Sequence, residues 1–94
     1  MTYPEKYNKM VKYMVIETHK EGCLQKAYDR FHKKGRMMPE GLHYIDSWLE
    51  KDSDRCFQLM ETNDFSLFKQ WTQNWEDLTH FEIVEIGEKP TPNE

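Results

Sequence analysis

The sequence predicts an α+β fold of the ferredoxin-like type, with two helices on one face of a four-stranded antiparallel sheet and the order β-α-β-β-α-β. Two observations predict this fold. Four short segments are rich in β-branched and aromatic residues, and two others repeat apolar residues at helical spacing. The length of 94 residues is that of one domain. We assign residues 11–87 to the domain, residues 1–10 to a polar lead-in and residues 88–94 to a flexible tail.

The first strand is expected over residues 11–17, where β-branched side chains are frequent. One face of this strand carries Tyr13 and Val15, and the other carries Met14 and Ile16. A strand that is apolar on both faces is normally covered on both sides. Both faces of the first strand are therefore expected to be covered.

The first helix is expected over residues 23–34, after a turn that contains Gly22. Its apolar residues are spaced at i, i+3, i+4 and i+7, so they share one helical face. They are Leu24, Ala27, Tyr28 and Phe31. Lys33 and Lys34 complement the helix dipole in the last turn, and Gly35 is expected to end the helix.

Two further strands, residues 42–50 and 55–62, are expected to pair as a hairpin. Residues 51–54, with the sequence Lys-Asp-Ser-Asp, supply the turn between them. The loop is expected to have two or three residues. The choice stays open, and a slip of one residue would move every side chain to the other face of the sheet.

The second helix is expected over residues 65–76, with Asp64 as its N-cap. Its apolar stripe consists of Phe68, Trp71 and Trp75. The fourth strand is expected over residues 81–86, where apolar side chains again occur on both faces. These segments complete the predicted order of elements.

The predicted sheet has large apolar side chains on both faces, and its two helices can shield only one of them. A single chain would then expose several hundred Å² of contiguous apolar surface, more than most monomers tolerate. Two sheets stacked face to face, about 10 Å apart, would bury this surface. We therefore expect a homodimer.

Composition excludes several functional classes. The net charge is −4, divided into +5 up to Arg36 and −9 beyond it, which argues against nucleic-acid binding. No apolar run approaches the roughly 20 residues of a membrane span, and residues 1–10 lack the apolar stretch of a signal peptide. We therefore expect a cytoplasmic protein in which both cysteines are free thiols. Because no phosphate-binding loop or metal-ligand spacing occurs, we expect neither a cofactor nor a metal ion.

Five segments carry a resemblance to a known family. They are Val11–Glu17, Gly35–Leu42, Asp46–Trp48, Arg55–Thr62 and Trp71–Leu78. Together they resemble the small bacterial DUF3303 family, which has no assigned function, and the similarity spans about residues 11–86. That family looks like a branch of the dimeric α+β barrel proteins, a superfamily that includes antibiotic-biosynthesis monooxygenases and muconolactone isomerases. The resemblance implies the fold and the homodimer, and it supplies no catalytic residues.

Charged side chains on the central hairpin are the candidates for acid–base catalysis. Asp46, Glu61 and His43 lie in otherwise apolar strands, where a buried charge must be paired or used. The alternative is that they occupy a solvated edge of the sheet. His19, near Glu17, is a further candidate base because histidine titrates near neutral pH, or else it is a solvated loop residue.

Five side chains are candidates for the walls of a ligand pocket. They are Trp48, Gln58, Trp71, Trp75 and Arg36. The tryptophans would supply an aromatic wall, although Trp71 and Trp75 have the spacing of a core stripe and can serve both roles. Gln58 would bind a ligand carbonyl or a neighbouring side chain, because a buried amide needs partners. Arg36 would clamp an anionic ligand, or it belongs to a solvated cluster that caps the helix.

The favoured function is the binding or transformation of a small apolar or aromatic molecule in a cavity beside the sheet. If the protein is an enzyme, we expect proton transfer or oxygenation without a cofactor. The alternative is a non-catalytic interaction or regulatory module that docks another protein on the dimer surface or on the basic residues Lys33, Lys34 and Arg36. A third hypothesis is a redox sensor at Cys23, whose thiol pKa a helix dipole would lower, whereas Cys56 is expected to be packing.

Overall fold

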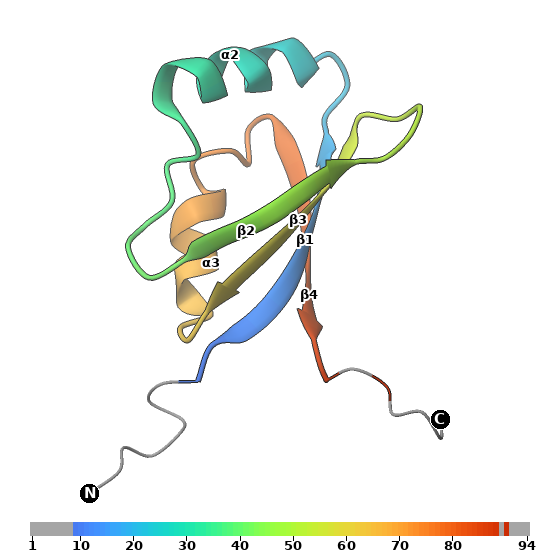
Figure 1. Cartoon of the computed structure of the whole chain (residues 1–94). Coiled ribbons are helices and arrows are strands. Elements are labelled where there is room, and N and C mark those ends of the chain that lie inside the picture. The colour runs from blue at the N-terminus through green and yellow to red at the C-terminus, as the bar shows by residue number, and fades with distance from the viewer. Residues whose placement is uncertain (1–8, 89, 91–94) are drawn as a thin grey trace, which may run out of the picture.

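The computed structural model describes residues 9–88 and residue 90 (Figure 1). Its elements are β1 (Val11–His19), α2 (Leu24–Lys34), β2 (His43–Leu49), β3 (Arg55–Thr62), α3 (Ser66–Thr72) and β4 (Thr79–Ile86). The order β-α-β-β-α-β is the predicted one. The lead-in at residues 1–8 and most of the expected tail lie outside the described residues.

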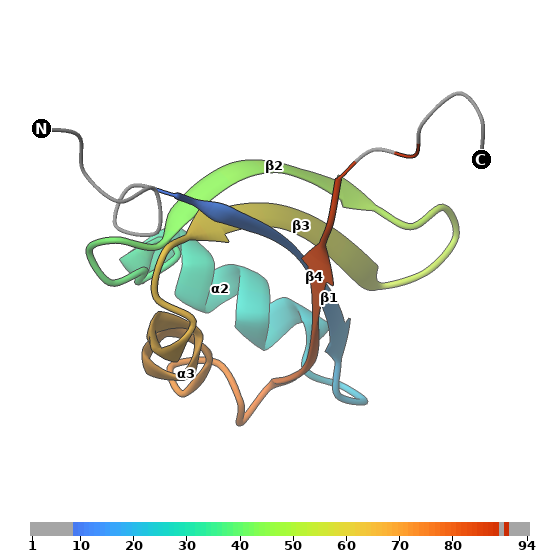
Figure 2. The ribbon, with the colours of Figure 1, turned by 90° about the horizontal axis from the view of Figure 1, so that it is seen from below.

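The four strands form one antiparallel sheet in the order β2-β3-β1-β4, with β1 and β3 at its centre. Both helices lie on the same side of this curved sheet (Figure 2). The predicted ferredoxin-like α+β fold is therefore confirmed. β1 pairs with β3 on one edge and with β4 on the other, so it lies inside the sheet.

The β2–β3 hairpin differs from the expectation in two ways. A bulge between Tyr44 and Asp46 shifts the register, so Tyr44 pairs with Met60 on the helix face while Trp48 pairs with Phe57 on the opposite face. The expected loop of two or three residues is also wrong. The backbone N–H of Glu50 donates to the carbonyl of Arg55 at 2.8 Å, which leaves residues 51–54 as a four-residue loop.

The second helix is shorter than predicted. It begins at Ser66 and ends at Thr72, because the backbone beyond it forms tighter turns, with the N–H of Trp75 donating to the carbonyl of Thr72 at 2.8 Å. Asp64 lies one residue outside the cap position, although its carboxylate still accepts the backbone N–H of Ser66 at 3.0 Å. The first and fourth strands are each two residues longer than expected, because His19 pairs with Thr79 and extends the ladder.

The hydrophobic core lies between α3 and the centre of the sheet. Phe68 and Trp71 of α3 are almost completely buried, in one cluster with Val15 and Met60 of the central strands. In α2, by contrast, only Ala27 is buried. Tyr28 and Phe31 lie on the same apolar stripe and remain about two-fifths exposed. The first helix therefore covers its part of the sheet without filling the space beneath it.

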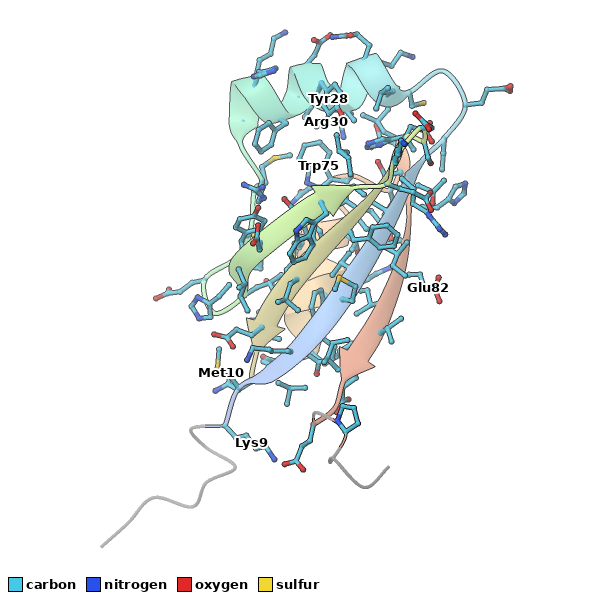
Figure 3. All side chains as sticks on the ribbon, turned by 45° about the vertical axis from the view of Figure 1, so that its right-hand side comes forward. Lys9, Met10, Tyr28, Arg30, Trp75 and Glu82 are labelled. Atoms are coloured by element: carbon cyan, nitrogen blue, oxygen red, sulfur yellow. The ribbon has the colours of Figure 1, made fainter. Side chains whose placement is uncertain are left out.

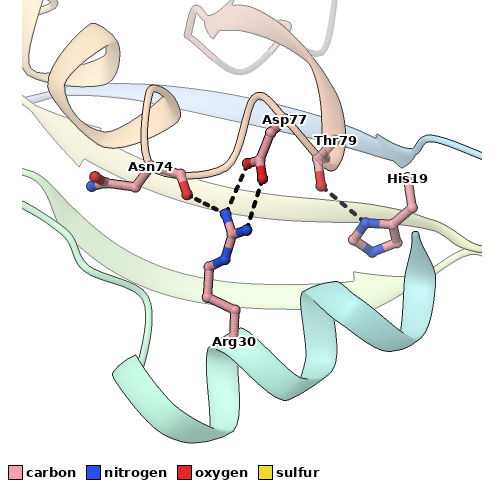
Figure 4. Close-up of polar contacts among 5 residues, drawn as sticks. All are labelled: His19, Arg30, Asn74, Asp77 and Thr79. Atoms are coloured by element: carbon pink, nitrogen blue, oxygen red, sulfur yellow. Dashed lines mark hydrogen bonds and ion pairs between the residues drawn. The ribbon is translucent and has the colours of Figure 1, made fainter.

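Arg30 fastens α2 to the connection between α3 and β4 (Figure 4). Its guanidinium donates two hydrogen bonds to the Asp77 carboxylate, both at 2.8 Å, and one to the carbonyl of Asn74 at 2.7 Å. The same group stacks on Trp75, 5.6 Å from the ring centroid. A bidentate arrangement of this kind fixes orientation as well as distance. The hydrogen bonds from Arg30 lower the pKa of Asp77 to about 2.

Asp77→Asn is expected to loosen α2 while leaving the sheet intact, because the amide cannot replace a bidentate carboxylate. Hydrogen exchange should become faster for the amides of α2 and stay unchanged for those of β1 and β3. Glu76→Gln is the matched control, because Glu76 makes only a long exposed ion pair with Lys69 at 3.7 Å. Unchanged exchange in α2 of Asp77→Asn would contradict the proposed fastening.

The face of the sheet opposite the helices carries a continuous apolar patch, which we call the open face. It consists of Met14, Ile16, Trp48, Phe57, Leu59, Val84 and Ile86. Cross-strand pairs place these side chains side by side, as Met14 with Leu59 and Val84. Trp48 is 49% exposed. Within residues 9–88, no helix covers this face (Figure 2).

Candidate functional site

A cavity of about 170 Å³ lies between α2 and the sheet, which we call the α2 cavity. Its apolar walls are Ala27, Tyr28, Phe31, Leu49, Trp71, Trp75 and Phe81. Its polar lining is Glu17, His19, Arg36, Ser47, Cys56, Gln58 and Thr79. Figure 3 shows Tyr28 below α2 and Trp75 between α2 and the strands, whereas Glu82 points outward from β4. The walls are thus mainly aromatic, and most of the polar groups come from the strands.

Glu17 places a carboxyl group on the sheet side of this cavity. Its neighbours across the sheet are Cys56 on β3 and Phe81 on β4, and all three line the cavity. Burial raises the pKa of Glu17 to about 7, although a hydrogen bond from Gln58 and the charge of Arg36 oppose the shift. A carboxyl group with this pKa exchanges its proton near neutral pH, as a general acid or base must.

Gln58 links Glu17 to Arg36. Its side-chain amide nitrogen donates to the Glu17 carboxylate, and its amide oxygen accepts a hydrogen bond from Nε of Arg36 at 3.4 Å. Gln58 is buried, so both ends of its amide need partners, and both have them. The result is a chain of three polar side chains along one side of the cavity.

The loop after α2 holds Arg36 in place. Gly35 and Met37, on either side of it, both have a positive φ, of 68° and 58°. For Met37 this conformation is strained, and such strain persists only where surrounding contacts enforce it. Those contacts come from the indole N–H groups of Trp71 and Trp75, which both donate to the carbonyl of Arg36, at 2.9 Å and 3.0 Å.

The Arg36 guanidinium lies over two aromatic rings. Its guanidinium carbon is 3.7 Å from the centroid of Tyr44 and 5.2 Å from that of Phe31. This stacking leaves the edge of the planar guanidinium available for hydrogen bonds. Within residues 9–88, the side-chain hydrogen bond that Arg36 makes is the one from Nε to Gln58, so its two terminal nitrogens are free to bind a ligand.

His19 and Cys56 complete the polar lining. Nδ1 of His19 lies 3.0 Å from the hydroxyl oxygen of Thr79 (Figure 4), and burial lowers the pKa of this histidine. Burial, with Glu17 beside it, raises the pKa of the Cys56 thiol to about 11. Cys56 is therefore a thiol at neutral pH and a poor nucleophile.

The structure divides the predicted site residues between the two faces of the sheet. Gln58, Trp71, Trp75 and Arg36 line the α2 cavity together, and both tryptophans also belong to the core. Trp48 is on the open face and does not line the α2 cavity, so its place in a ligand pocket stays a prediction. The bulge in β2 causes the difference, because it reverses the facing of the residues after Tyr44.

The three predicted acid–base residues also lie away from the α2 cavity. Asp46 and Glu61 are on the open-face side of β2 and β3, with Asp46 opposite Leu59 and Glu61 opposite Lys12. His43 pairs with Glu61 and is exposed. Asp46 uses its carboxylate to accept the backbone N–H of Ser47 at 2.8 Å. Their catalytic role stays a prediction to which the cavity gives no support.

From the sequence, Glu17 is identified only as a neighbour of the candidate base His19. A signal was present, because Glu17 has the same parity in β1 as Tyr13 and Val15, which are buried beneath the helices. A charged residue at a core-facing strand position is costly unless it has a function or a partner. Its partners could not be found from sequence spacing, since Arg36 and Gln58 come from other parts of the chain.

Membrane-spanning helices and metal clusters are both absent from the described residues. In residues 9–88 and residue 90, no helix has the length and hydropathy needed to cross a membrane. The same part of the chain contains no group of three or more histidine, cysteine, aspartate or glutamate side chains arranged to hold a metal ion.

Comparison with known proteins places the chain in a family. The profile of a family described as a domain of unknown function (DUF3303) matches residues 11–86. Comparisons with curated proteins and with solved structures each returned no match. The family match covers every helix and strand from Val11 to Ile86. The chain therefore belongs to the DUF3303 family.

Proposed function

We propose that this protein binds a small molecule with a single aromatic or other planar ring in the α2 cavity. The observation that carries the proposal is the gathering of Glu17, Gln58 and Arg36 beside aromatic walls in one cavity. Keeping an ionisable carboxyl in such a place costs stability, and residues that do so are concentrated at functional sites.

The size of the cavity limits the ligand. Drug-sized ligands occupy pockets of about 300–1,000 Å³, whereas a cavity of about 150 Å³ in another protein holds benzene. The α2 cavity, at about 170 Å³, therefore matches a single ring with one or two substituents. Phe31 and Leu49 line the cavity and are 38% and 64% exposed, so the ring can enter between α2 and the end of β2.

Filling the cavity should abolish binding without harming the fold. Ala27→Leu adds three carbons at a buried position of α2, and we expect it to stabilise the protein by up to about 2 kcal/mol while it excludes a ring. We expect toluene to bind the natural chain with a dissociation constant in the millimolar range. Binding should change the amide chemical shifts of residues around Gln58 and Trp75, as measured by NMR.

Lys26→Leu is the matched control, because it introduces the same side chain on the exposed side of α2. It should leave toluene binding unchanged. The proposal fails if neither toluene nor phenol perturbs a residue of the cavity in the natural chain, or if Ala27→Leu, shown to be folded, binds toluene as well as Lys26→Leu does.

We also propose that the protein is a homodimer in which two open faces stack, forming a dimeric α+β barrel. The support is the apolar patch that no helix of the described residues covers, with Ile16 and Phe57 at its centre. Burying such a patch against a second copy is strongly favourable. The α2 cavity lies on the other face, so each chain would keep its own complete site.

One argument for the alternative function, a protein-interaction module, does not hold. Arg36, which was expected to join Lys33 and Lys34 in a basic docking surface, points instead toward Gln58 and Tyr44. Lys33 and Lys34 remain exposed at the end of α2. Ligand binding in the α2 cavity is therefore the function that the geometry supports best.

A further inference from the structure

We infer that the ligand of the α2 cavity carries a weakly acidic hydroxyl group, as a phenol or an enol does, which donates its hydrogen bond to Glu17 and accepts one from Arg36. The inference rests on the proposed function, and it adds the chemical class of the ligand. It follows from the hydrogen-bonding capacity that the three polar side chains leave unused.

Glu17 offers the ligand an acceptor. Gln58 donates to Oε2 of the Glu17 carboxylate. Within residues 9–88, Oε1 has no hydrogen-bond donor, and the carboxyl lines the cavity. A carboxylate accepts and does not donate, so a ligand that satisfies it has to bring a donor.

Arg36 offers the ligand donors. Its Nε is used by Gln58, and its guanidinium lies over the rings of Tyr44 and Phe31. The two terminal nitrogens carry only donors, because a guanidinium has no acceptor at any ordinary pH. A ligand that satisfies Arg36 therefore has to bring an acceptor, and one that carries or develops negative charge is favoured.

The groups that a ring can carry differ in how well they meet both requirements. An ammonium group brings only donors and would meet the charge of Arg36, and a carboxylate brings only acceptors and would meet the charge of Glu17. A plain hydrocarbon would leave Oε1 of Glu17 and the terminal nitrogens of Arg36 without partners in a partly desolvated space. A hydroxyl brings one donor and acceptor lone pairs on the same oxygen, so it satisfies both side chains at once.

Acidity strengthens this match. The ordinary pKa of a phenol lies near 10, that of a tyrosine side chain. As the hydroxyl proton moves toward Glu17, negative charge grows on the ligand oxygen, where the Arg36 guanidinium stabilises it. Gln58 fixes the positions of the two charged side chains relative to each other, because its amide is hydrogen-bonded to both. The aromatic walls then bind the ring to which the hydroxyl is attached.

Phenol and toluene test the inference, because they have nearly the same shape and differ by a hydroxyl in place of a methyl group. An apolar cavity alone would bind toluene more tightly, since the hydroxyl loses its hydration. We expect the natural chain to bind phenol about tenfold more tightly than toluene, because a hydrogen bond to a charged acceptor exceeds that loss. The measurement is the ratio of the two dissociation constants at about pH 8.5, where Glu17 is ionised and phenol is not.

Two variants locate the origin of the preference. In Glu17→Gln and in Arg36→Met the ratio should fall to about one or reverse in favour of toluene, while toluene itself still binds. Retained toluene binding shows that the cavity has survived, so the ratio is insensitive to general damage. Glu82→Gln, on the outer side of β4, is the control and should keep the ratio of the natural chain.

The outcomes separate the two proposals. If toluene binds and phenol binds no more tightly, or if the preference survives in Glu17→Gln, the ligand class is overturned and the cavity site stands. If neither compound binds the natural chain, the proposed function fails as well.

Discussion

We expect Glu17→Gln to alter the pH dependence of the stability of the protein more than any other conservative substitution does. Folding raises the pKa of this carboxyl from 4.5 to about 7. The folded chain therefore holds the proton more tightly than the unfolded chain, and ionisation in the fold costs stability. The cost is absent below the unfolded pKa, grows as the pH rises between the two values, and is complete above about 7.

The size of the effect follows from the shift, which corresponds to about 3 kcal/mol. Glutamine has nearly the same shape and no charge, and its carbonyl can accept the hydrogen bond from Gln58. The free energy of unfolding of Glu17→Gln, relative to the natural chain, should therefore rise by about 3 kcal/mol between about pH 4 and about pH 8.5. Urea denaturation at a series of pH values measures it.

Glu21→Gln is the control here, because Glu21 is exposed in the turn before α2, outside the cavity and away from the open face. Its stability should follow that of the natural chain at every pH. Parallel curves for Glu17→Gln and the natural chain would show that Glu17 is not buried in a cavity of the kind described.

A single lysine on the open face should separate the proposed dimer into stable monomers. Leu59 lies at the middle of this face, between Met14 on β1 and Asp46 on β2. In Leu59→Lys the new ammonium group can pair with Asp46 in a single chain, so the fold is preserved. In a stacked dimer the same group would be buried against apolar side chains at a cost of several kcal/mol.

Sedimentation equilibrium at micromolar concentration measures this effect. The natural chain should have the mass of two subunits and Leu59→Lys the mass of one. Gln73→Lys, which adds the same charge at an exposed position just after α3, should remain a dimer. A natural chain that sediments as a monomer at this concentration would remove the dimer and leave the α2 cavity untouched, because the two lie on opposite faces.

Much of the fold follows from local patterns in the sequence. The boundaries of β3 were predicted to the residue, because its flanking turn and its β-branched and aromatic content are both clear. Gly35 ends α2 as expected, since glycine adopts the positive φ of 68° without strain. Fold class and element order depend on such features, which act over a few residues.

The site depends on features that local patterns do not contain. A bulge at β2 reversed the side on which Trp48 lies, and no residue type in that strand requires a bulge. The α2 cavity exists because α2 is held above the sheet by long-range contacts, such as that of Arg30 with Asp77. Glu17, Arg36 and Gln58 meet only after distant parts of the chain have packed, so their spacing in the sequence carries no motif.

The most direct test of the proposed site is a titration of the Glu17 side-chain carboxyl, observed by NMR through its carbon resonance. The buried position beside the α2 cavity predicts a midpoint near pH 7, which should move upward when toluene excludes water from the cavity. A midpoint near the ordinary 4.5, unaffected by toluene, would contradict both the burial of Glu17 and its place in a ligand site.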